Sequence, residues 1–374
     1  MTTPVRRACR SRRRSRGEAS PAGQHEHRTS MTSTDPGPAA TRRGTEFADL
    51  TRVIKQHGLL DRRRRSYAAK FAVNAILLVG GWTAFFVLGS SWWQVATAVF
   101  LALVHTQLAF IGHDAGHKQI FASRRGNDIV GHVHAGLVGM SYGWWIGKHN
   151  RHHANPNHED EDPDIQISVL AFTSDQAAAK RGVLRWLTRY QAALFFPLLL
   201  AEGVALHVSG VKAVLRREVK AVRLEGALLA AHVVGYLAAV FWVLSPVQAL
   251  VFIAVHQGLW GVYMGCSFAP NHKGMPTVSA GQRLDFLRKQ VLTSRNVRGG
   301  WVVDFLLGGL NYQIEHHLFP NMPRFNLRRA QPLVQQFCAH NGIPYSQTSA
   351  LGSYRQVLSH LHAIGAPLRQ AKGH

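Results

Sequence analysis

Cysteine is nearly absent from this 374-residue chain, which contains only Cys9, Cys266 and Cys338. No two of them lie close together in the sequence. This spacing excludes a zinc ribbon, a cysteine-ligated iron–sulfur cluster and a disulfide framework. Any metal in the protein must therefore be held by nitrogen or oxygen ligands.

Acidic residues are also scarce, with 20 Asp and Glu against 43 Lys and Arg and a formal net charge of +23. Much of this excess is local, because residues 1–65 contain 16 Lys or Arg and 6 Asp or Glu. Such a stretch suits either a nucleic acid or an anionic membrane surface; we favour the membrane and expect no nucleic-acid partner. Residues 1–45 lack apolar periodicity, so we predict a disordered basic leader there.

Charged residues of either sign make up only 17% of the chain, against 46% hydrophobic residues. The apolar residues form four runs of the length that a helix needs to cross a bilayer core, about 20 residues. The runs form two pairs with uncharged turns, at 70–89 with 92–111 and at 226–244 with 247–266. The sequence therefore predicts an all-α integral membrane protein, with four transmembrane helices in two hairpins inside a membrane domain of residues 46–374.

Basic residues flank the outer ends of both pairs, as at 62–65 and 216–223. By the positive-inside rule, both hairpins enter the membrane from the cytoplasm and return to it, with both chain termini and a helical cap on the cytosolic side. A fifth apolar stretch, 190–208, is interrupted by Pro197 and Glu202. An intramembrane carboxylate is costly, so we expect this stretch to lie at the interface.

Histidines gather in three short segments on the predicted cytosolic side: HDAGH at 113–117, HNRHH at 149–153 and QIEHH at 313–317. Residues three or four apart share one face of a helix, so each segment is able to aim two or three ring nitrogens at a common point. Three such segments on one side of the membrane predict a shared metal site. Its predicted ligands are His113, His117, His149, His152, His153, His316 and His317.

Seven histidines exceed what one ion takes from a protein, which indicates two metal ions. Imidazole suits zinc, copper, iron and nickel, and a zinc hydrolase would leave four of the histidines idle, which favours a redox metal. Carboxylates near the histidines would accept hydrogen bonds from the outward ring nitrogens. These carboxylates are Asp114, Asp162, Asp164 and Glu315. For the acidic run 159–164, a solvated loop that balances local charge is an equal alternative.

These motifs resemble those of the membrane fatty acid desaturase family, in the branch of front-end desaturases and actinobacterial acyl-CoA desaturases. The resemblance lies in HDAGH, in KHNRHHANPNHEDEDPD at 148–164 and in NYQIEHHLFPNMPR at 311–324, and it extends over about residues 46–360. It implies a di-iron centre held by the seven histidines, an eighth ligand at His272 in FAPNHKG, and a weak or water-mediated ligand at Gln313. It also implies a bacterial plasma membrane with the site facing the cytosol.

The resemblance implies an oxygen-dependent desaturase that introduces a cis double bond into a fatty acyl-CoA or acyl-lipid among the membrane lipids, with two iron ions and O2 as co-substrate. The chain contains neither the HPGG motif of a fused cytochrome b5 domain nor a Gly-rich dinucleotide fingerprint. We therefore expect an external electron donor of ferredoxin or cytochrome b5 type, with its reductase. A hydroxylase with the same site, a metal transporter and a basic membrane scaffold are alternatives. The QIEHHLFP stretch favours desaturation over hydroxylation.

Overall fold

The computed structural model describes residues 38–370, and the compact unit discussed below begins at Arg42. Four of its helices are long and apolar enough to cross a membrane: α2 (Arg64–Leu88), α3 (Gln94–Gly116), α10 (Val222–Val243) and α11 (Pro246–His272). The predicted all-α architecture with two hairpins is confirmed. The predicted bounds were too narrow at the ends that lead to the cap, because α2 and α10 begin earlier, and α3 and α11 continue later, with polar residues.

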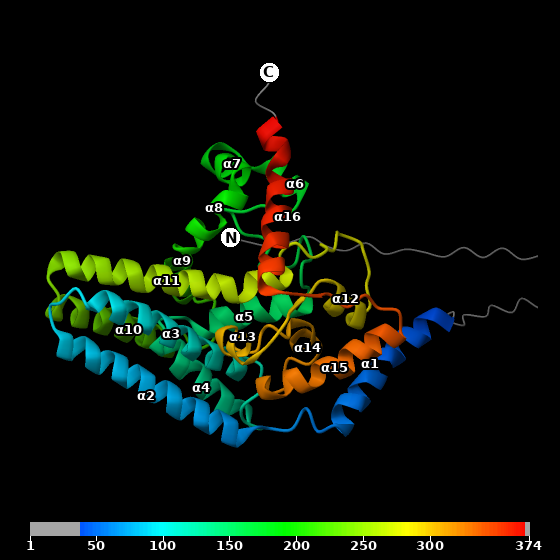
Figure 1. The fold of residues 1–374 in the computed structure, drawn as a ribbon, viewed down its shortest axis with the longest axis horizontal. Coiled ribbons are helices and arrows are strands. Elements are labelled where there is room, and N and C mark those ends of the chain that lie inside the picture. The colour runs from blue at the N-terminus through cyan, green and yellow to red at the C-terminus, as the bar shows by residue number, and fades with distance from the viewer. Residues whose placement is uncertain (1–37, 371–374) are drawn as a thin grey trace, which may run out of the picture. The chain divides into compact units, whose positions relative to one another are not determined.

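The four helices run side by side, with α3 and α11 packed against each other (Figure 1). Burial differs sharply among them, since 67% of the apolar window of α3 is buried but only 17% of those of α2 and α10. The outer helices therefore present their side chains to lipid, while α3 forms the centre. At Gly81, where α2 meets α3, an added Cβ would lie 2.7 Å from the Leu101 side chain, so glycine permits this close contact.

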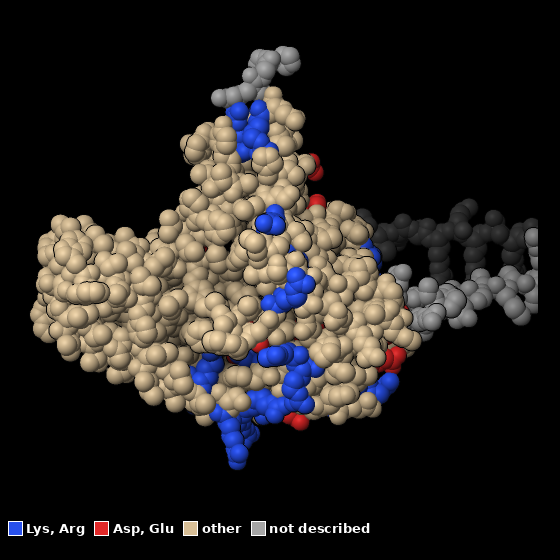
Figure 2. All heavy atoms as spheres, in the orientation of Figure 1, with Lys and Arg blue, Asp and Glu red and all other residues tan. Residues whose placement is uncertain are grey.

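The turns of the hairpins lie at the ends of these helices farthest from the histidines. The first turn contains Gly89 at φ 56°, and the second begins α11 with Ser245 in a capping box with Gln248 and with Pro246 in the first turn. On the face seen in Figure 2, no Lys, Arg, Asp or Glu atom is visible over these ends, whereas Lys and Arg gather near the start of α2. This distribution matches a membrane-embedded end and a polar end.

The fifth apolar stretch forms two helices, α8 (Gln191–Leu199) and α9 (Glu202–Leu215), which meet at 68°. The break lies between Pro197 and Glu202, the two residues that were predicted to interrupt it. The pair is either a broken span or a re-entrant segment by its geometry. Its placement at the membrane interface stays a prediction.

The remaining elements form the cap and its connections. They are α1 (Pro38–Gln56), α4 (Arg124–Leu137), α5 (Tyr142–Ala154), α6 (Ser174–Ala179), α7 (Gly182–Arg189), α12 (Phe286–Leu292), α13 (Trp301–Leu306), α14 (Gln313–Leu318), α15 (Arg324–His340) and α16 (Ala350–Gln370). Two short strands, β1 (Asn296–Val297) and β2 (Gln347–Thr348), pair in parallel with Asn296 opposite Gln347. Buried side chains such as Leu50, Ile314 and Val334 form the cap's apolar core.

The predicted basic leader of residues 1–45 falls mostly outside the described residues. Only its last part is described, where α1 begins at Pro38. The leader and the domain boundary at residue 46 therefore stay predictions.

Candidate metal centre

Helix ends and one short helix bring the predicted histidines together from four parts of the chain. His113 lies in the last turn of α3 and His117 directly follows it, while α5 presents three histidines from its last two turns. His272 is the last residue of α11, and α14 carries His316 and His317. The cap thus closes over the polar end of the membrane hairpins, with the histidines between them.

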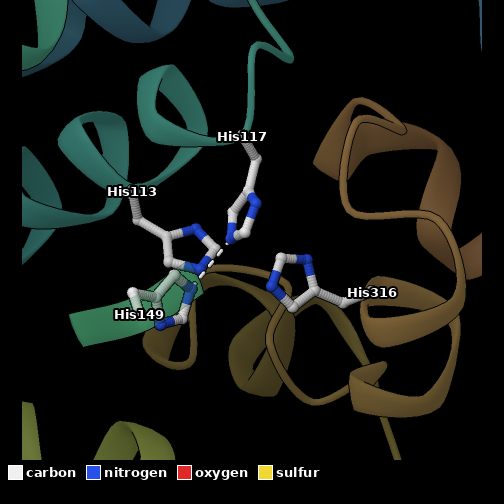
Figure 3. Close-up of side chains that lie close together, drawn as sticks. All are labelled: His113, His117, His149 and His316. Atoms are coloured by element: carbon white, nitrogen blue, oxygen red, sulfur yellow. Dashed lines mark hydrogen bonds between the residues drawn. The ribbon is translucent and has the colours of Figure 1, made fainter. Parts of the chain in front are cut away.

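The ring nitrogens form two groups. The four-histidine group consists of His113, His117, His149 and His316, each of which places one nitrogen within 4.8 Å of the others (Figure 3). The three-histidine group consists of His152, His272 and His317, by the same measure. His153 lies between the groups, with its Nε2 3.1 Å from His149 Nε2 and its ring stacked on His317 at 4.2 Å.

The buried nitrogens in these groups are unusual because many have no hydrogen-bond partner within the described part of the chain. They are His113 Nε2, both ring nitrogens of His316, His317 Nε2 and His153 Nδ1. Buried polar atoms are normally hydrogen-bonded, and each exception needs an explanation. Convergent lone pairs of neutral imidazoles are what a transition-metal ion binds, so the residues present fit two such ions.

The protonation state of the rings suits metal binding, which requires neutral imidazole. Five of the rings have pKa values well below the ordinary value for histidine. Burial is the largest cause, and repulsion from neighbouring imidazoles is the next. The five are His117, His149, His153, His316 and His317. These rings therefore remain neutral at physiological pH. Protonating them would place several cations in one buried space.

The outward nitrogens of the three-histidine group are held by hydrogen bonds. His152 Nδ1 lies 3.0 Å from both carboxylate oxygens of Asp162, His272 Nδ1 donates to the Thr293 carbonyl at 3.1 Å, and His317 Nδ1 donates to Gln290 Oε1 at 2.9 Å. Such bonds fix the tautomer that leaves Nε2 free to bind a metal. Burial alone would lower the pKa of His152, but Asp162 and Asp164 raise it.

The other predicted carboxylates differ in their surroundings. Asp164 Oδ2 lies 3.5 Å from His152 Nδ1 and its Oδ1 pairs with Lys148 at 2.6 Å. Glu315 instead accepts hydrogen bonds from Asn296 Nδ2 and the Tyr345 hydroxyl, both at 2.7 Å, and burial raises its pKa to about 7. One helical step separates it from His316, so it points toward β1 rather than toward the ring nitrogens.

Asp114 belongs to a buried network that sequence reasoning found only in part. Its Oδ1 lies 3.5 Å from His113 Nδ1, while its Oδ2 accepts from the Tyr67 hydroxyl at 2.9 Å and from Arg324 Nε. Arg324 also donates to the Phe110 carbonyl in α3. Arg324 therefore ties the end of α3 to α15, although the motif analysis assigned it no role.

Gln313 lies at the three-histidine group, and its role as a weak or water-mediated ligand stays a prediction. Its Nε2 is 2.8 Å from His272 Nε2, and its Oε1 accepts from Asn271 Nδ2 at 3.2 Å. The side chain is buried. An amide here would offer a bound metal ion a weaker ligand than imidazole.

Glu225 of α10 is a second residue that sequence reasoning missed. Its buried carboxylate accepts from the backbone N–H of Gly143 at 3.2 and 3.1 Å and from the Ser141 hydroxyl, both at the start of α5. A carboxylate at a helix N-terminus satisfies free N–H groups and interacts favourably with the helix dipole. The second hairpin thus anchors the helix that carries three of the histidines. A carboxylate directly before an apolar run was the available signal, since a carboxylate at the edge of the membrane needs a partner.

A cavity of about 180 Å³ adjoins the histidines. His149, His152, His272 and Gln313 line one side of it. The other sides are mostly apolar and include Trp145, Phe172, Phe195, Leu206 and Phe268, whereas Lys148, Asp164, Glu202 and Lys273 supply polar atoms. The arrangement suits a ligand with a long apolar part and a polar group.

Fold and site together define a helical membrane protein with a buried, histidine-lined candidate metal centre. A sequence model described as fatty acid desaturase matches residues 90–349, a stretch that contains both histidine groups. The chain belongs to the fatty acid desaturase family.

Three relatives illustrate the range of similar proteins. The chain is 33% identical to the acyl-lipid (9-3)-desaturase of Physcomitrium patens over 72% of its own length and 53% of that protein. It is 31% identical to the delta(6)-fatty-acid desaturase fat-3 of Caenorhabditis elegans, over 84% and 74% of the two chains. It is 30% identical to the delta 8-(E)-sphingolipid desaturase of Emericella nidulans, over 86% of its own length and 62% of that protein. The chain therefore spans about half to three quarters of these relatives.

Proposed function

We propose that this protein is an oxygen-dependent fatty acyl desaturase with a di-iron centre. The observation that carries the proposal is the pair of adjacent groups of histidine nitrogens, several of them buried without a partner, beside a largely apolar cavity. The reaction removes one hydrogen from each of two neighbouring methylene carbons. With O2, two electrons and two protons, it forms the double bond and two molecules of water.

The two groups divide the ligands between the ions. The four-histidine group would hold one iron, and the three-histidine group, with Gln313 as a weak or water-mediated ligand, would hold the other. His153 lies close to both groups. Bound iron would supply the redox chemistry that an unactivated methylene requires, because such a carbon has no acidic proton for a general base to remove.

The protein's own residues orient the histidine rings and exclude water from the cavity. Asp162, the Thr293 carbonyl and Gln290 fix the tautomers of the three-histidine group, and the Asp114–Arg324 pair holds the end of α3. The apolar wall of the cavity would exclude water and would hold the acyl chain beside the histidine groups.

The substrate is an acyl chain on coenzyme A or on a lipid. Lys148 pairs with the Asp164 carboxylate and Lys273 donates to the Asp164 carbonyl. Each ammonium group has three N–H donors, so both lysines would keep a donor for the ester or thioester carbonyl. The relatives named above include an acyl-lipid and a sphingolipid desaturase, which supports a lipid-linked chain as one of the two possibilities.

Electrons come from an external donor of ferredoxin or cytochrome b5 type with its reductase. We place the site and both termini in the cytosol, at a bacterial plasma membrane, because basic residues flank the polar ends of the hairpins. A basic surface attracts an acidic donor, so turnover should fall as ionic strength rises. Turnover that is insensitive to both salt and the identity of the donor would contradict this partner.

The test is expression in a host that lacks the activity, followed by gas chromatography–mass spectrometry of fatty acid methyl esters. We expect a new monounsaturated or further-unsaturated ester that is absent from the His152→Ala strain. An unchanged profile with donor and oxygen supplied, a new peak that survives the substitution, or a hydroxylated ester in its place would overturn the proposal.

A further inference from the structure

Helix α7 (Gly182–Arg189) exposes its apolar residues and turns its polar ones toward the protein. Val183, Leu184 and Trp186 are 74%, 36% and 54% exposed, whereas Thr188 is fully buried and Arg189 is half-buried. A surface helix of a soluble protein has the opposite arrangement, with its apolar stripe against the core and its polar face in water. The reversed pattern indicates that apolar surroundings lie outside α7.

The inner side of α7 packs closely against α16. A Cβ atom at Gly365 of α16 would lie 2.8 Å from the Thr188 carbonyl oxygen, so glycine permits this approach of the two backbones. Arg369 Nη1 also donates to the Arg189 carbonyl at 2.9 Å. These contacts fix which face of α7 points outward.

Helices α7, α8 and α16 form an arm that is attached to α11 at one level. The Tyr354 hydroxyl of α16 donates to the Cys266 carbonyl at 2.7 Å, and the Leu199 side chain at the end of α8 packs directly on Gly265. Cys266 lies 20 residues after Pro246, the first residue of α11, which is about 30 Å along the helix. The hydrocarbon core of a bilayer is also about 30 Å thick. The arm therefore leaves α11 where the core would end on the side of the metal centre.

The arm lies across the direction of the membrane helices. Figure 1 shows α16 running across α11, with α7 and α8 on the side of α16 toward the hairpin turns. Both helices contact α16, and Gln191 Nε2 at the start of α8 donates to the Leu361 carbonyl of α16 at 3.0 Å. Since the spans run along the bilayer normal, the arm would lie along the bilayer surface, with α7 between that surface and α16.

The charges around α7 are all positive. Residues 180–189 contain Lys180, Arg181, Arg185 and Arg189 and no Asp or Glu, and in the described part of the chain none of the four pairs with a carboxylate. Arg181 Nη1 donates to the Ala178 and Lys180 carbonyls, which leaves its other donors free. Anionic headgroups attract Lys and Arg at a membrane surface, and a short amphipathic helix with Trp and Arg is typical of that interface. A symmetric contact with a second copy would instead bring like charges together.

We propose that α7 is an interfacial helix that binds the anionic surface of the bilayer, with Val183 and Trp186 below the headgroups and Arg181 and Arg185 at the lipid phosphates. Helix α8 follows α7 after one residue and forms part of the wall of the cavity beside the histidines. Contact with anionic lipid would therefore hold one wall of that cavity in place. The proposal does not rest on the proposed desaturation.

The test measures quenching of Trp186 by brominated lipids, with the full chain in nanodiscs of equal amounts of phosphatidylcholine and phosphatidylglycerol. The acyl-chain bromines are carried by one lipid or by the other, so the charge of the bilayer stays the same. Bromine quenches a tryptophan that it contacts, and the difference between wild type and Trp186→Phe isolates the signal of this exposed side chain. We expect both lipids to quench Trp186, with brominated phosphatidylglycerol quenching it about twofold more strongly or better, because the arginines enrich anionic lipid around α7.

The double variant Arg181→Gln with Arg185→Gln should lose the preference for phosphatidylglycerol and keep the quenching itself. Arg328→Gln with Arg329→Gln, at two exposed positions of α15, removes the same charge and should keep the preference. Equal quenching by the two lipids in the wild type, or a preference that survives Arg181→Gln with Arg185→Gln, would overturn the proposal. So would a Trp186 that neither lipid quenches, and a dimeric chain in that nanodisc would then assign this face of α7 to a second copy.

Discussion

The protein contains two sets of inward-facing histidines that behave in opposite ways. At the metal centre, nitrogens converge within 4.8 Å and several have no hydrogen-bond partner in the described range. Inside the membrane bundle, His256 bonds to His105 and Tyr236, and His207 of the neighbouring helix α9 bonds to the Gly139 carbonyl and Gln257. The first set leaves lone pairs for an ion, whereas the second uses its ring nitrogens within the protein.

This difference shows that burial of a histidine does not by itself indicate a metal. Imidazoles of both sets are buried, and ring nitrogens lie close together in both, 2.8 Å apart for His117 with His149 and 2.7 Å apart for His105 with His256. What distinguishes them is the number of nitrogens that share one point and the partners of the other ring nitrogen. Substitutions in the two sets should therefore affect different measurements.

The largest effect is expected for His316→Ala, because both ring nitrogens of His316 are buried without a described hydrogen-bond partner. Loss of this ligand should abolish desaturation, to below about 1% of wild type, since metal-centre ligands act as a unit. Product formation is measured by gas chromatography–mass spectrometry. His340→Ala, at an exposed position at the end of α15, should leave the activity as in wild type. Equal activity in both variants would contradict a role for His316 as a ligand.

A smaller effect is expected for Asp162→Asn, which preserves the size of the side chain but removes the charge that holds His152 Nδ1–H. Loss of such a hydrogen-bonding partner typically lowers metal affinity or activity about 10–100-fold. A competition titration with a chelator measures the iron affinity of the purified protein. Asp160→Asn, an exposed change in the same loop, is the matched control. A loss of the same size in both variants would indicate an effect of loop charge instead.

His256→Phe should lower the stability of the protein and leave its iron content at the wild-type level, whereas the substitutions at the metal centre lower activity or iron affinity. The substitution leaves His105 and the Tyr236 hydroxyl without their bond to His256, and an unsatisfied buried group costs about 1–3 kcal/mol. The Tm in detergent should fall relative to His362→Phe, at an exposed position of α16. A loss of iron with an unchanged Tm would mean that the two sets of histidines are not separate.

The smallest effect is expected for Glu225→Gln at the start of α5. The amide keeps one acceptor for the Gly143 N–H but removes the charge that faces the helix N-terminus, an interaction of about 0.3–1 kcal/mol. We expect activity to fall only severalfold, with a slight loss of iron affinity, because α5 carries three of the histidines. Glu218→Gln, on the exposed loop before α10, is the control. Wild-type activity and iron affinity in Glu225→Gln would contradict the anchoring role.

Much of the fold followed from the sequence because apolar runs and uncharged turns determine membrane hairpins directly. The predicted bounds of the membrane helices were less accurate at the ends near the cap. There α11 continues through the polar residues Asn271 and His272, because the cap buries them. The bend between α8 and α9 fell at the predicted interruption. Apolar length could not show whether this pair spans the membrane.

The histidine segments were visible because spacing along a helix is local, and the structure brings all eight histidines to one centre. Arg324 and Glu225 were missed because their partners are remote, with Asp114 at a separation of 210 residues from Arg324 and Ser141 at 84 from Glu225. Neighbouring residues carry no signal of such pairs. Glu315 was placed by proximity to His316, although a one-residue step along a helix turns it toward Asn296.

The most direct test of this account is the metal content of the purified, iron-reconstituted wild-type protein, measured by inductively coupled plasma mass spectrometry against protein concentration. Two groups of convergent histidine nitrogens predict two iron ions per chain. A content of one iron ion or fewer in protein that desaturates its substrate, or two zinc ions in place of iron, would contradict it.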